Sequence, residues 1–308
     1  MRIVVTGGAG FVGSALIPLL LRAGHEVLVY DSLLWGGHAL LPHFLHPRFS
    51  FTEGDVRDVG ALRSALRGAQ AVVHLAALVG YPLCKKLPRD AVEVNVDGAR
   101  HVVDLAPDDA FLVYASTGSN YGEVVGVCNE ETPLNPLSLY GETKTSAEAL
   151  FTARPGSASL RFATAFGVAP RLRLDLMIND FVWQALHRRH LVVYEKHFRR
   201  TFLHVTDIAR AILFALENRA MLGFPVFNIG HESLNFTKQD ICDLIRRRVE
   251  FEVYYAEFGS DDDRRDYHVD YSRARGAGFD IQVDIEAGLD ELIRALPLVK
   301  VQNPYSNV

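Results

Sequence analysis

The segment Thr6-Gly7-Gly8-Ala9-Gly10-Phe11-Val12-Gly13 constrains the fold more than any other part of the 308-residue chain. It follows an apolar run at residues 3–6 that is typical of a strand. It precedes residues 11–23, where apolar side chains recur at helical spacing. Glycines at these spacings permit a tight turn, the close approach of a pyrophosphate and close packing of the helix on the sheet. The start of the helix would offer free N–H groups to phosphate. A glycine turn without a ligand is the alternative.

Short apolar runs alternate with segments of helical periodicity over the first half of the chain. The expected strands are residues 3–6, 26–30, 49–53, 71–75, 111–115 and 159–162, and the expected helices are residues 11–23, 59–66, 89–105 and 140–153. Strands that are apolar along nearly their whole length are typical of a parallel sheet covered on both faces. The pattern predicts an α/β fold with a Rossmann-like, doubly wound parallel sheet.

Beyond Gly167 the alternation is less regular and indicates a smaller α/β lobe. Helices are expected at residues 171–189, 206–218, 237–248 and 284–295, and strands at 191–194, 227–229 and 250–255. There is no internal repeat, low-complexity tract or flexible linker, so we expect two interleaved lobes. Residues 1–166 would form the Rossmann domain, to which residues 202–229 return, and residues 167–201 and 230–308 would form the second lobe. The cleft between the lobes is the expected site.

Composition and charge exclude several classes of protein. An apolar fraction of 49% is enough to bury a full core, which excludes a disordered chain. The net charge of −5 argues against a nucleic-acid partner. Three scattered cysteines favour neither a disulfide framework nor a zinc site, and the histidines at 38, 43 and 46 lack the acidic or thiol neighbours of a metal site. Met1 runs directly into the first strand, so we expect no signal peptide. The apolar run at residues 15–21 is too short to span a bilayer, so we expect no membrane segment and a cytoplasmic location.

Asp31 strengthens the case for a dinucleotide. It ends the second expected strand, 18 residues after Gly13, where a carboxylate would bond the hydroxyl groups of the adenosine ribose. No Arg or Lys lies between Tyr30 and Pro47, and a carboxylate would repel a 2′-phosphate. The sequence therefore predicts NAD rather than NADP as cofactor.

Tyr140 and Lys144 lie one helical turn apart, at positions i and i+4 of an expected helix. A nearby ammonium group lowers the pKa of a phenol, which would allow the phenolate to act as a base at neutral pH. An ordinary helix pair is the alternative. Hydroxyl groups at residues 116–119 follow the fifth strand, at the sheet edge where such folds bind ligands.

These motifs together resemble the extended short-chain dehydrogenase/reductase family, and within it the nucleotide-sugar epimerases and dehydratases. The resemblance covers essentially the whole chain. Besides the glycine loop, Asp31 and the Tyr140/Lys144 pair, it is carried by Gly54-Asp55-Val56, His74-Leu75-Ala76-Ala77, Asn95, the hydroxyl segment 116–119, Leu160-Arg161-Phe162 and residues 200–207.

The resemblance implies a role for each candidate residue. Tyr140 would act as the catalytic base and acid, Lys144 would bind the nicotinamide ribose and tune Tyr140, and Thr117 would bond the reacting hydroxyl. The residues expected to contact NAD are Gly7, Gly10, Phe11, Val12, Gly13, Asp31, Asp55, Val56, Leu75, Ala76, Ala77, Asn95, Ala115, Tyr140 and Lys144. Those expected to contact a nucleotide-diphosphate sugar are Thr117, Ser119, Tyr81, Cys84, Asn179, Arg200 and Arg265.

The two positions after Thr117 discriminate among the reactions of this family. Its 4,6-dehydratases carry Asp-Glu there and its decarboxylases usually carry a Glu, whereas this chain has Gly118 and Ser119. Epimerisation at C4 needs no further acid, because the ketone rotates and takes the hydride back on its other face. The resemblance therefore favours an epimerase acting through a 4-keto sugar. A dehydratase or reductase and a non-catalytic NAD-binding module remain alternatives.

Two further questions stay open at this level. Cys84 is either a second acid/base near the sugar or a packed apolar residue. The helices expected at residues 89–105 and 140–153 correspond to those that pair in a twofold four-helix interface in relatives, which implies a homodimer. Ala147, Ala149, Leu150 and Phe151 would supply an apolar stripe for that interface, although burial in the core would give the same pattern.

Overall fold

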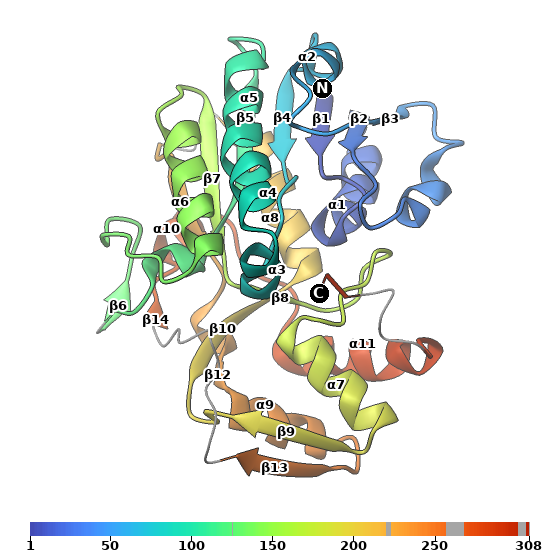
Figure 1. Ribbon diagram of the computed structural model, residues 1–308, viewed down its shortest axis with the longest axis vertical. Coiled ribbons are helices and arrows are strands. Elements are labelled where there is room, and N and C mark those ends of the chain that lie inside the picture. The colour runs from blue at the N-terminus through green and yellow to red at the C-terminus, as the bar shows by residue number, and fades with distance from the viewer. Residues whose placement is uncertain (125, 220–222, 257–267, 301–305, 308) are drawn as a thin grey trace.

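A seven-stranded parallel sheet forms the centre of the computed structural model, which describes residues 1–124, 126–219, 223–256, 268–300 and 306–307 (Figure 1). The strand order is β11-β7-β5-β4-β1-β2-β3. The strands are β1 (Arg2–Thr6), β2 (Glu26–Asp31), β3 (Phe49–Glu53), β4 (Ala71–His74), β5 (Phe111–Thr117), β7 (Ser157–Phe162) and β11 (Val226–Ile229). The order reverses at β1, which is the crossover of a doubly wound sheet. The predicted Rossmann-like α/β fold is confirmed.

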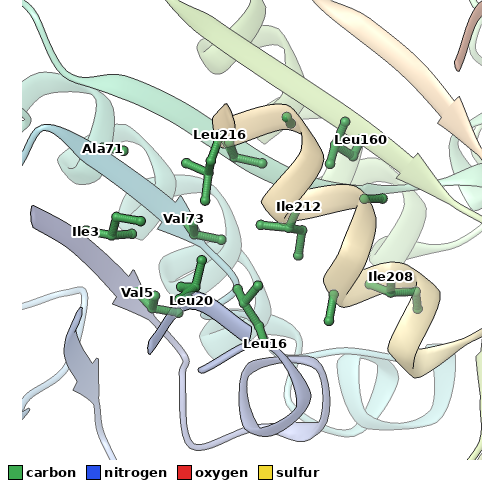
Figure 2. Close-up of a cluster of buried hydrophobic side chains, with 14 of the residues drawn as sticks. Ile3, Val5, Leu16, Leu20, Ala71, Val73, Leu160, Ile208, Ile212 and Leu216 are labelled. Atoms are coloured by element: carbon green, nitrogen blue, oxygen red, sulfur yellow. The ribbon is translucent and has the colours of Figure 1, made fainter. Parts of the chain in front are cut away.

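Helices cover both faces of this sheet, which explains why its strands carry few polar residues. On one face α1 (Phe11–Arg22) and α8 (Val205–Glu217) pack over side chains such as Ile3, Val5 and Val73, the cluster that Figure 2 shows. On the other face Val4 and Val72 point toward α2 (Val59–Leu66), α5 (Gly98–Leu105) and α6 (Leu139–Thr152). Successive side chains of a strand point to opposite faces of the sheet. Since helices cover both faces, the side chains on each face are mostly apolar.

The helix predicted at residues 89–105 is present in three parts. It consists of α4 (Pro88–Val92), a π-helical turn η2 (Glu93–Asp97) and α5, preceded by a short helix α3 (Tyr81–Lys86) that the sequence did not suggest. Two short 3₁₀ segments, η1 (His38–His43) and η3 (Gly118–Tyr121), follow β2 and β5. Both lie just past the carboxyl ends of their strands.

The second lobe consists of short strands and helices below the main sheet in Figure 1. A three-stranded sheet has the order β12-β10-β8, and two parallel pairs are β13-β9 and β14-β6. The strands are β6 (Val127–Cys128), β8 (Thr164–Phe166), β9 (His190–Tyr194), β10 (Arg199–His204), β12 (Asn235–Thr237), β13 (Glu252–Ala256) and β14 (His268–Val269). The helices of this lobe are α7 (Met177–His187), α9 (Lys238–Arg246) and α11 (Ile285–Ala295), with 3₁₀ turns η5 (Glu232–Leu234) and η6 (Leu296–Leu298). The short helix α10 (Ser272–Gly276) instead packs through Ala274 on the core of the main sheet. A second core that includes Phe202, Val182 and Leu289 joins α7, α9 and α11.

The expectation of one helix over residues 171–189 is wrong at its start, because α7 begins only at Met177. Contacts with distant parts of the chain occupy the backbone of the preceding segment. The Arg171 N–H donates to Ser14 Oγ at 3.2 Å, and Asn179 Nδ2 donates to the carbonyl of Arg173 at 2.8 Å. The bond from Asn179 satisfies a carbonyl that a longer helix would have paired internally, whereas the N–H of Arg171 would need an outside partner such as Ser14 even at the start of a helix.

Among the described residues, no helix has the length and apolar character needed to cross a bilayer.

Candidate active site

A cavity of about 1470 Å³ lies between the carboxyl edge of the main sheet and the second lobe. Its walls include the glycine loop, the ends of β2, β4 and β5, the start of α6, and residues of β9, β10 and α7. Open α/β sheets bind ligands at this edge, next to the point where the strand order reverses.

The glycine loop has the close packing that a dinucleotide site requires. Gly7 has a φ of +74°, and a Cβ atom there would lie 2.5 Å from the backbone nitrogen of Ala76. A Cβ atom on Gly13 would lie 2.4 Å from the carbonyl oxygen of Gly8, inside the loop itself. Glycine at these positions lets the loop lie against the end of β4 and brings its backbone to the cavity wall. The loop therefore fits a pyrophosphate.

Asp31 connects the end of β2 to the same loop. Its carboxylate accepts hydrogen bonds from the N–H of Ala9 at 2.9 Å and of Leu33 at 2.8 Å, and it lines the cavity. Burial raises the pKa of Asp31, while the two backbone bonds act in the opposite direction. A carboxylate fixed beside the loop is suited to accept the hydroxyl groups of a ribose. Farther along this wall, Asp55 is held by Arg57 at 2.7 Å, and this bonding lowers the pKa of Asp55.

The helix α6 brings Tyr140 and Lys144 to the cavity. Lys144 is only 4% exposed, and its Nζ lies 4.3 Å from the ring centroid of Tyr114. Burial lowers the pKa of Lys144 to about 7, against the opposing influence of Glu148 and Cys84. Thr117, at the end of β5, faces the same cavity and donates from Oγ1 to Ser119 Oγ at 3.1 Å. The phenol, ammonium and hydroxyl groups therefore line one cavity.

A buried charge network that the sequence analysis missed lies behind these residues. Glu148 accepts from Arg161 at 2.6 Å and from Ser116 Oγ at 2.6 Å, and Asn120 Nδ2 donates to the same hydroxyl at 3.0 Å. Arg161 also donates to Tyr121 Oη at 2.9 Å. The network connects α6, β5 and β7 directly behind Thr117. One available signal was Glu148 at position i+4 from Lys144, on the same face of the helix.

Most of the residues predicted from the sequence line the cavity, and three do not. Those that line it are Gly7, Gly10, Phe11, Val12, Gly13, Asp31, Asp55, Val56, Leu75, Ala76, Ala77, Tyr81, Ala115, Thr117, Ser119, Tyr140, Lys144 and Arg200. The structure places Cys84, Asn95 and Asn179 behind the wall. Arg265 lies outside the described residues.

The three residues behind the wall use their side chains to join segments of backbone. Cys84 is fully buried and its thiol donates to the carbonyl of Leu78 at 3.3 Å, and burial raises its pKa to about 11. Asn95 bonds both the N–H and the carbonyl of Leu78. Asn179 bonds both backbone groups of Gly167. All three positions therefore shape the loops that form the wall.

The carboxylates of the cavity wall include two, Asp90 and Asp175, that were not predicted from the sequence, and each carboxylate has a bonding partner within the chain. The described carboxylates of the wall are Asp31, Asp55, Asp90 and Asp175. Asp31 is held by backbone N–H groups, and Asp55 and Asp90 share Arg57. Asp175 is paired with Arg173. Among the described residues, no group of three or more His, Cys, Asp or Glu side chains is placed to hold a metal ion.

Comparison with known proteins assigns the family. Residues 3–230 match the model of the NAD-dependent epimerase/dehydratase family. The chain belongs to this family. The match confirms the resemblance inferred from the sequence motifs, and it confirms NAD as the cofactor.

Curated relatives of the chain catalyse more than one reaction. It is 31% identical to a UDP-glucose 4-epimerase of Corynebacterium glutamicum over 254 residues, which covers 75% of each chain. It is 30% identical to UDP-glucuronic acid decarboxylase 1 of Arabidopsis thaliana over 264 residues, which covers 81% of this chain but only 59% of that relative. The family members are enzymes that modify nucleotide sugars, and the comparisons leave the particular reaction open.

A solved structure shows the same arrangement over nearly the whole chain. The dTDP-glucose 4,6-dehydratase of Streptomyces venezuelae, determined with NAD and TYD bound, superposes with a TM-score of 0.83 at 28% identity. The superposition covers 96% of each chain. The fold of both lobes is therefore that of an enzyme of this family.

Proposed function

We propose that this protein is an NAD-dependent nucleotide-sugar epimerase that inverts C4 through a transient 4-keto sugar. The observation that carries the proposal is the chemistry beside Thr117. The next two residues are Gly118 and Ser119, and each of the four described carboxylates of the cavity wall already bonds a backbone N–H or an arginine. A dehydratase needs a free acid and base at the sugar, whereas hydride return to the opposite face needs neither.

The proposed roles follow from the placement of the side chains. Tyr140 removes the proton of the sugar hydroxyl and returns it to the ketone oxygen. NAD, when bound, supplies the acceptor and donor of the hydride. Lys144 holds a positive charge one turn from the phenol and favours the phenolate form. Thr117 bonds the reacting hydroxyl, and its own bond to Ser119 at 3.1 Å fixes the direction of its Oγ1.

The lowered pKa of Lys144 supports this arrangement. An ammonium group with a pKa of about 7 sits close to its charge transition at neutral pH. Loss of a proton from Tyr140 would favour the charged form of Lys144, and gain of a proton would favour the neutral form. Lys144 can therefore carry its charge, and stabilise the phenolate, when Tyr140 has lost its proton. When Tyr140 is protonated, Lys144 can be neutral, so no permanent charge has to be buried.

The substrate would be a nucleotide-diphosphate sugar that enters between the two lobes. Arg200 is only 6% exposed and lines the cavity from β10 of the second lobe. Guanidinium groups bond phosphate oxygens in pairs. Tyr81 and Ser119 line the same cavity, and we propose that they contact the sugar.

The experiment that tests this function incubates the purified protein with a panel of nucleotide sugars in heavy water, followed by chromatography and mass spectrometry. An isomer of unchanged mass is expected, because direct hydride return introduces no solvent deuterium. Loss of water or of carbon dioxide would replace the proposal by a dehydratase or a decarboxylase. An isomer that carries deuterium would show enolisation and contradict the C4 mechanism. No turnover, with and without added NAD, would favour a non-catalytic NAD-binding module.

The Tyr140→Phe variant tests the assignment of the base. It should lose at least about a thousandfold in turnover while retaining NAD, since general base catalysis supplies most of this loss and the ring remains. The matched control is Tyr254→Phe, which removes a phenol that is exposed in the second lobe. Equal rates for both variants would refute the role of Tyr140.

We also propose a homodimer through the helical segment of residues 89–105, which comprises α4, η2 and α5, and through α6. Ala147 and Phe151 of the expected stripe are fully buried in the core of the chain itself, so they contribute nothing to such an interface. Ala149 remains exposed on α6, and Val92 is 41% exposed on α4. Sedimentation as a monomer at micromolar concentration would refute this proposal.

A further inference from the structure

Arg171 is a buried cation in the cavity wall, and no described carboxylate forms an ion pair with it. The residue is 8% exposed and lies in the segment between β8 and α7. Its Nη1 donates to the carbonyl of Leu172 at 3.1 Å, and its Nη2 donates to Asn307 Oδ1 at 2.6 Å. The guanidinium carbon lies 5.4 Å from the ring centroid of Trp35. These three partners of the guanidinium are all neutral.

Such a charge is unfavourable in the absence of an anion. Burial lowers the pKa of Arg171 to about 10, and the neighbouring charge of Arg173 acts in the same direction. Arg173 itself is neutralised, because it bonds Asp175 through both Nε and Nη2. A guanidinium held out of water by three contacts and left without a counter-ion is suited to receive a negatively charged ligand.

The position of Arg171 indicates which ligand this is. Its backbone N–H donates to Ser14 Oγ at 3.2 Å, and Ser14 lies in the first turn of α1. Two residues before Arg171, Ala169 packs against Phe11, which also lies in the first turn of α1. The segment that carries Arg171 is therefore fixed to the end of α1 that follows the glycine loop.

Trp35 contacts the guanidinium of Arg171 from the Rossmann domain. It belongs to the loop that follows Asp31, and Leu34, Trp35 and Gly36 line the cavity. The guanidinium thus lies between the residues that face a ribose and the N-terminal turn of α1. In a Rossmann fold the pyrophosphate of the dinucleotide occupies this place.

We propose that Arg171 binds the pyrophosphate of NAD and, held between Trp35 and Asn307, retains the cofactor in the cleft. The glycine loop at residues 6–13 offers only neutral N–H groups and contains no Lys or Arg. Arg171 adds the positive charge that the loop lacks, and its planar fork can bond two phosphate oxygens together. The bond from Arg171 to Asn307 places residue 307 beside the segment that leads into α7.

The contact connects three parts of the chain that are far apart in sequence. Trp35 comes from the Rossmann domain, Arg171 from the segment after β8, and Asn307 from beyond α11. Trp35 lies against the face of the guanidinium of Arg171, and Asn307 accepts a hydrogen bond from one edge of it. The remaining edge is available to an anion in the cavity. Cofactor release would require this contact to break.

The test measures cofactor binding without turnover, so its result is independent of the proposed epimerase activity. NADH, ADP and adenosine are titrated against wild type and Arg171→Gln, with NADH fluorescence as the signal and ADP and adenosine as competitors, and the binding of UDP to both proteins is measured separately by calorimetry. The control is Arg154→Gln, which removes an equal charge from a half-buried arginine that bonds the carbonyl of Pro107 outside the cavity. Thermal melts of each variant establish that it is folded.

Arg171→Gln should weaken NADH and ADP binding about 10- to 100-fold, the range for loss of hydrogen bonds to a charged group. Adenosine, which has no phosphate, should change by less than about twofold, and Arg154→Gln should change none of the three. Arg171→Lys should lie between wild type and Arg171→Gln, because it keeps the charge and loses the fork. Asn307→Ala should speed the release of NADH severalfold during a chase with excess NAD.

Three results would overturn the proposal. Equal losses for ADP and adenosine would show that Arg171 only shapes the cavity. Unchanged NADH binding would remove the contact altogether. Weaker binding of UDP with unchanged binding of NADH would assign the guanidinium to the diphosphate of the substrate. If Arg171→Gln does not fold, the same titrations are made with Arg171→Lys and Asn307→Ala, and the same three results would overturn the proposal.

Discussion

Replacing Glu148 by Gln tests whether the buried network behind the site carries the stability that its geometry indicates. The side chains of Glu148 and Arg161 are each only 4% exposed, and they are joined at 2.6 Å. The same carboxylate accepts from Ser116 Oγ at 2.6 Å and from Asn120 Nδ2 at 3.3 Å. Gln has nearly the shape of Glu and can accept some of these bonds, but it leaves the charge of Arg161 without a partner.

The expected loss follows from that unpaired charge. Removing one partner of a buried ion pair costs about 3–5 kcal/mol in the free energy of unfolding, because the remaining ion stays out of water. The amide oxygen of Gln still accepts hydrogen bonds, so we expect a loss near the lower end, about 3 kcal/mol. This is a large share of the roughly 5–15 kcal/mol that stabilises a typical folded domain.

The assay is urea unfolding at one fixed NAD concentration, since bound cofactor adds to the apparent stability. Glu26→Gln is the matched control. It breaks an ion pair with Arg2 at 3.9 Å in which Glu26 is 60% exposed. Screening by water limits the worth of such a pair to about 1 kcal/mol or less. The double variant Glu148→Leu with Arg161→Met removes both charges and should recover part of the loss, since Ser116, Asn120 and Tyr121 each lose one partner.

The reasoning fails if Glu148→Gln costs no more than Glu26→Gln. It also fails if the double variant is as unstable as the single one, since the loss would then come from packing rather than from the unpaired charge. The m-value should stay unchanged, because neither substitution alters the surface exposed on unfolding.

Three other substitutions test the site. Burial lowers the pKa of Lys144 from 10.5 to about 7, so between these values the unfolded chain binds more protons and stability rises with pH. The stability of Lys144→Met relative to wild type should therefore fall between pH 7 and pH 9, as urea unfolding at both values would measure. Cys84→Ala should retain most of the turnover, because the pKa of about 11 leaves little thiolate at neutral pH; a loss beyond a hundredfold would assign it a chemical role. Gly7→Ala should cost at least about 1–3 kcal/mol, since an L-residue is strained at φ +74°. Gly276→Ala, where a Cβ atom meets nothing within 4 Å, should instead match or slightly exceed wild type in the same assay.

The main sheet was predictable because its signals are local. The strands expected at residues 3–6 and 26–30 are β1 (Arg2–Thr6) and β2 (Glu26–Asp31), each within one residue at either end. A strand buried on both faces must be apolar along its length, and a helix that follows it must show the 3.6-residue period. Both requirements are visible in short windows of sequence. The spacing of Tyr140 and Lys144 is local in the same sense.

The loops of the site were less predictable because distant residues fix them. Asn95 and Asn179 each satisfy both backbone groups of a single residue in another segment, Leu78 and Gly167 respectively. An amide can bind a ligand or a backbone segment, and nothing in the flanking sequence distinguishes the two uses. Cys84 is similar, because its burial under the loop after β4 depends on how α3 packs. Composition and spacing identify such residues as polar or reactive without locating them.

Arg171 shows most clearly what local sequence cannot supply. The apolar periodicity of residues 171–189 predicts a helix, and in a helix Arg171 would be an ordinary basic residue of the first turn. The structure instead leaves residues 171–176 outside α7, and the N–H of Arg171 donates to Ser14 Oγ, 157 positions away in the sequence. The guanidinium lies against Trp35 and within the cavity wall. The contacts that surround Arg171 come from residues far away along the chain, so no local window of sequence contains them.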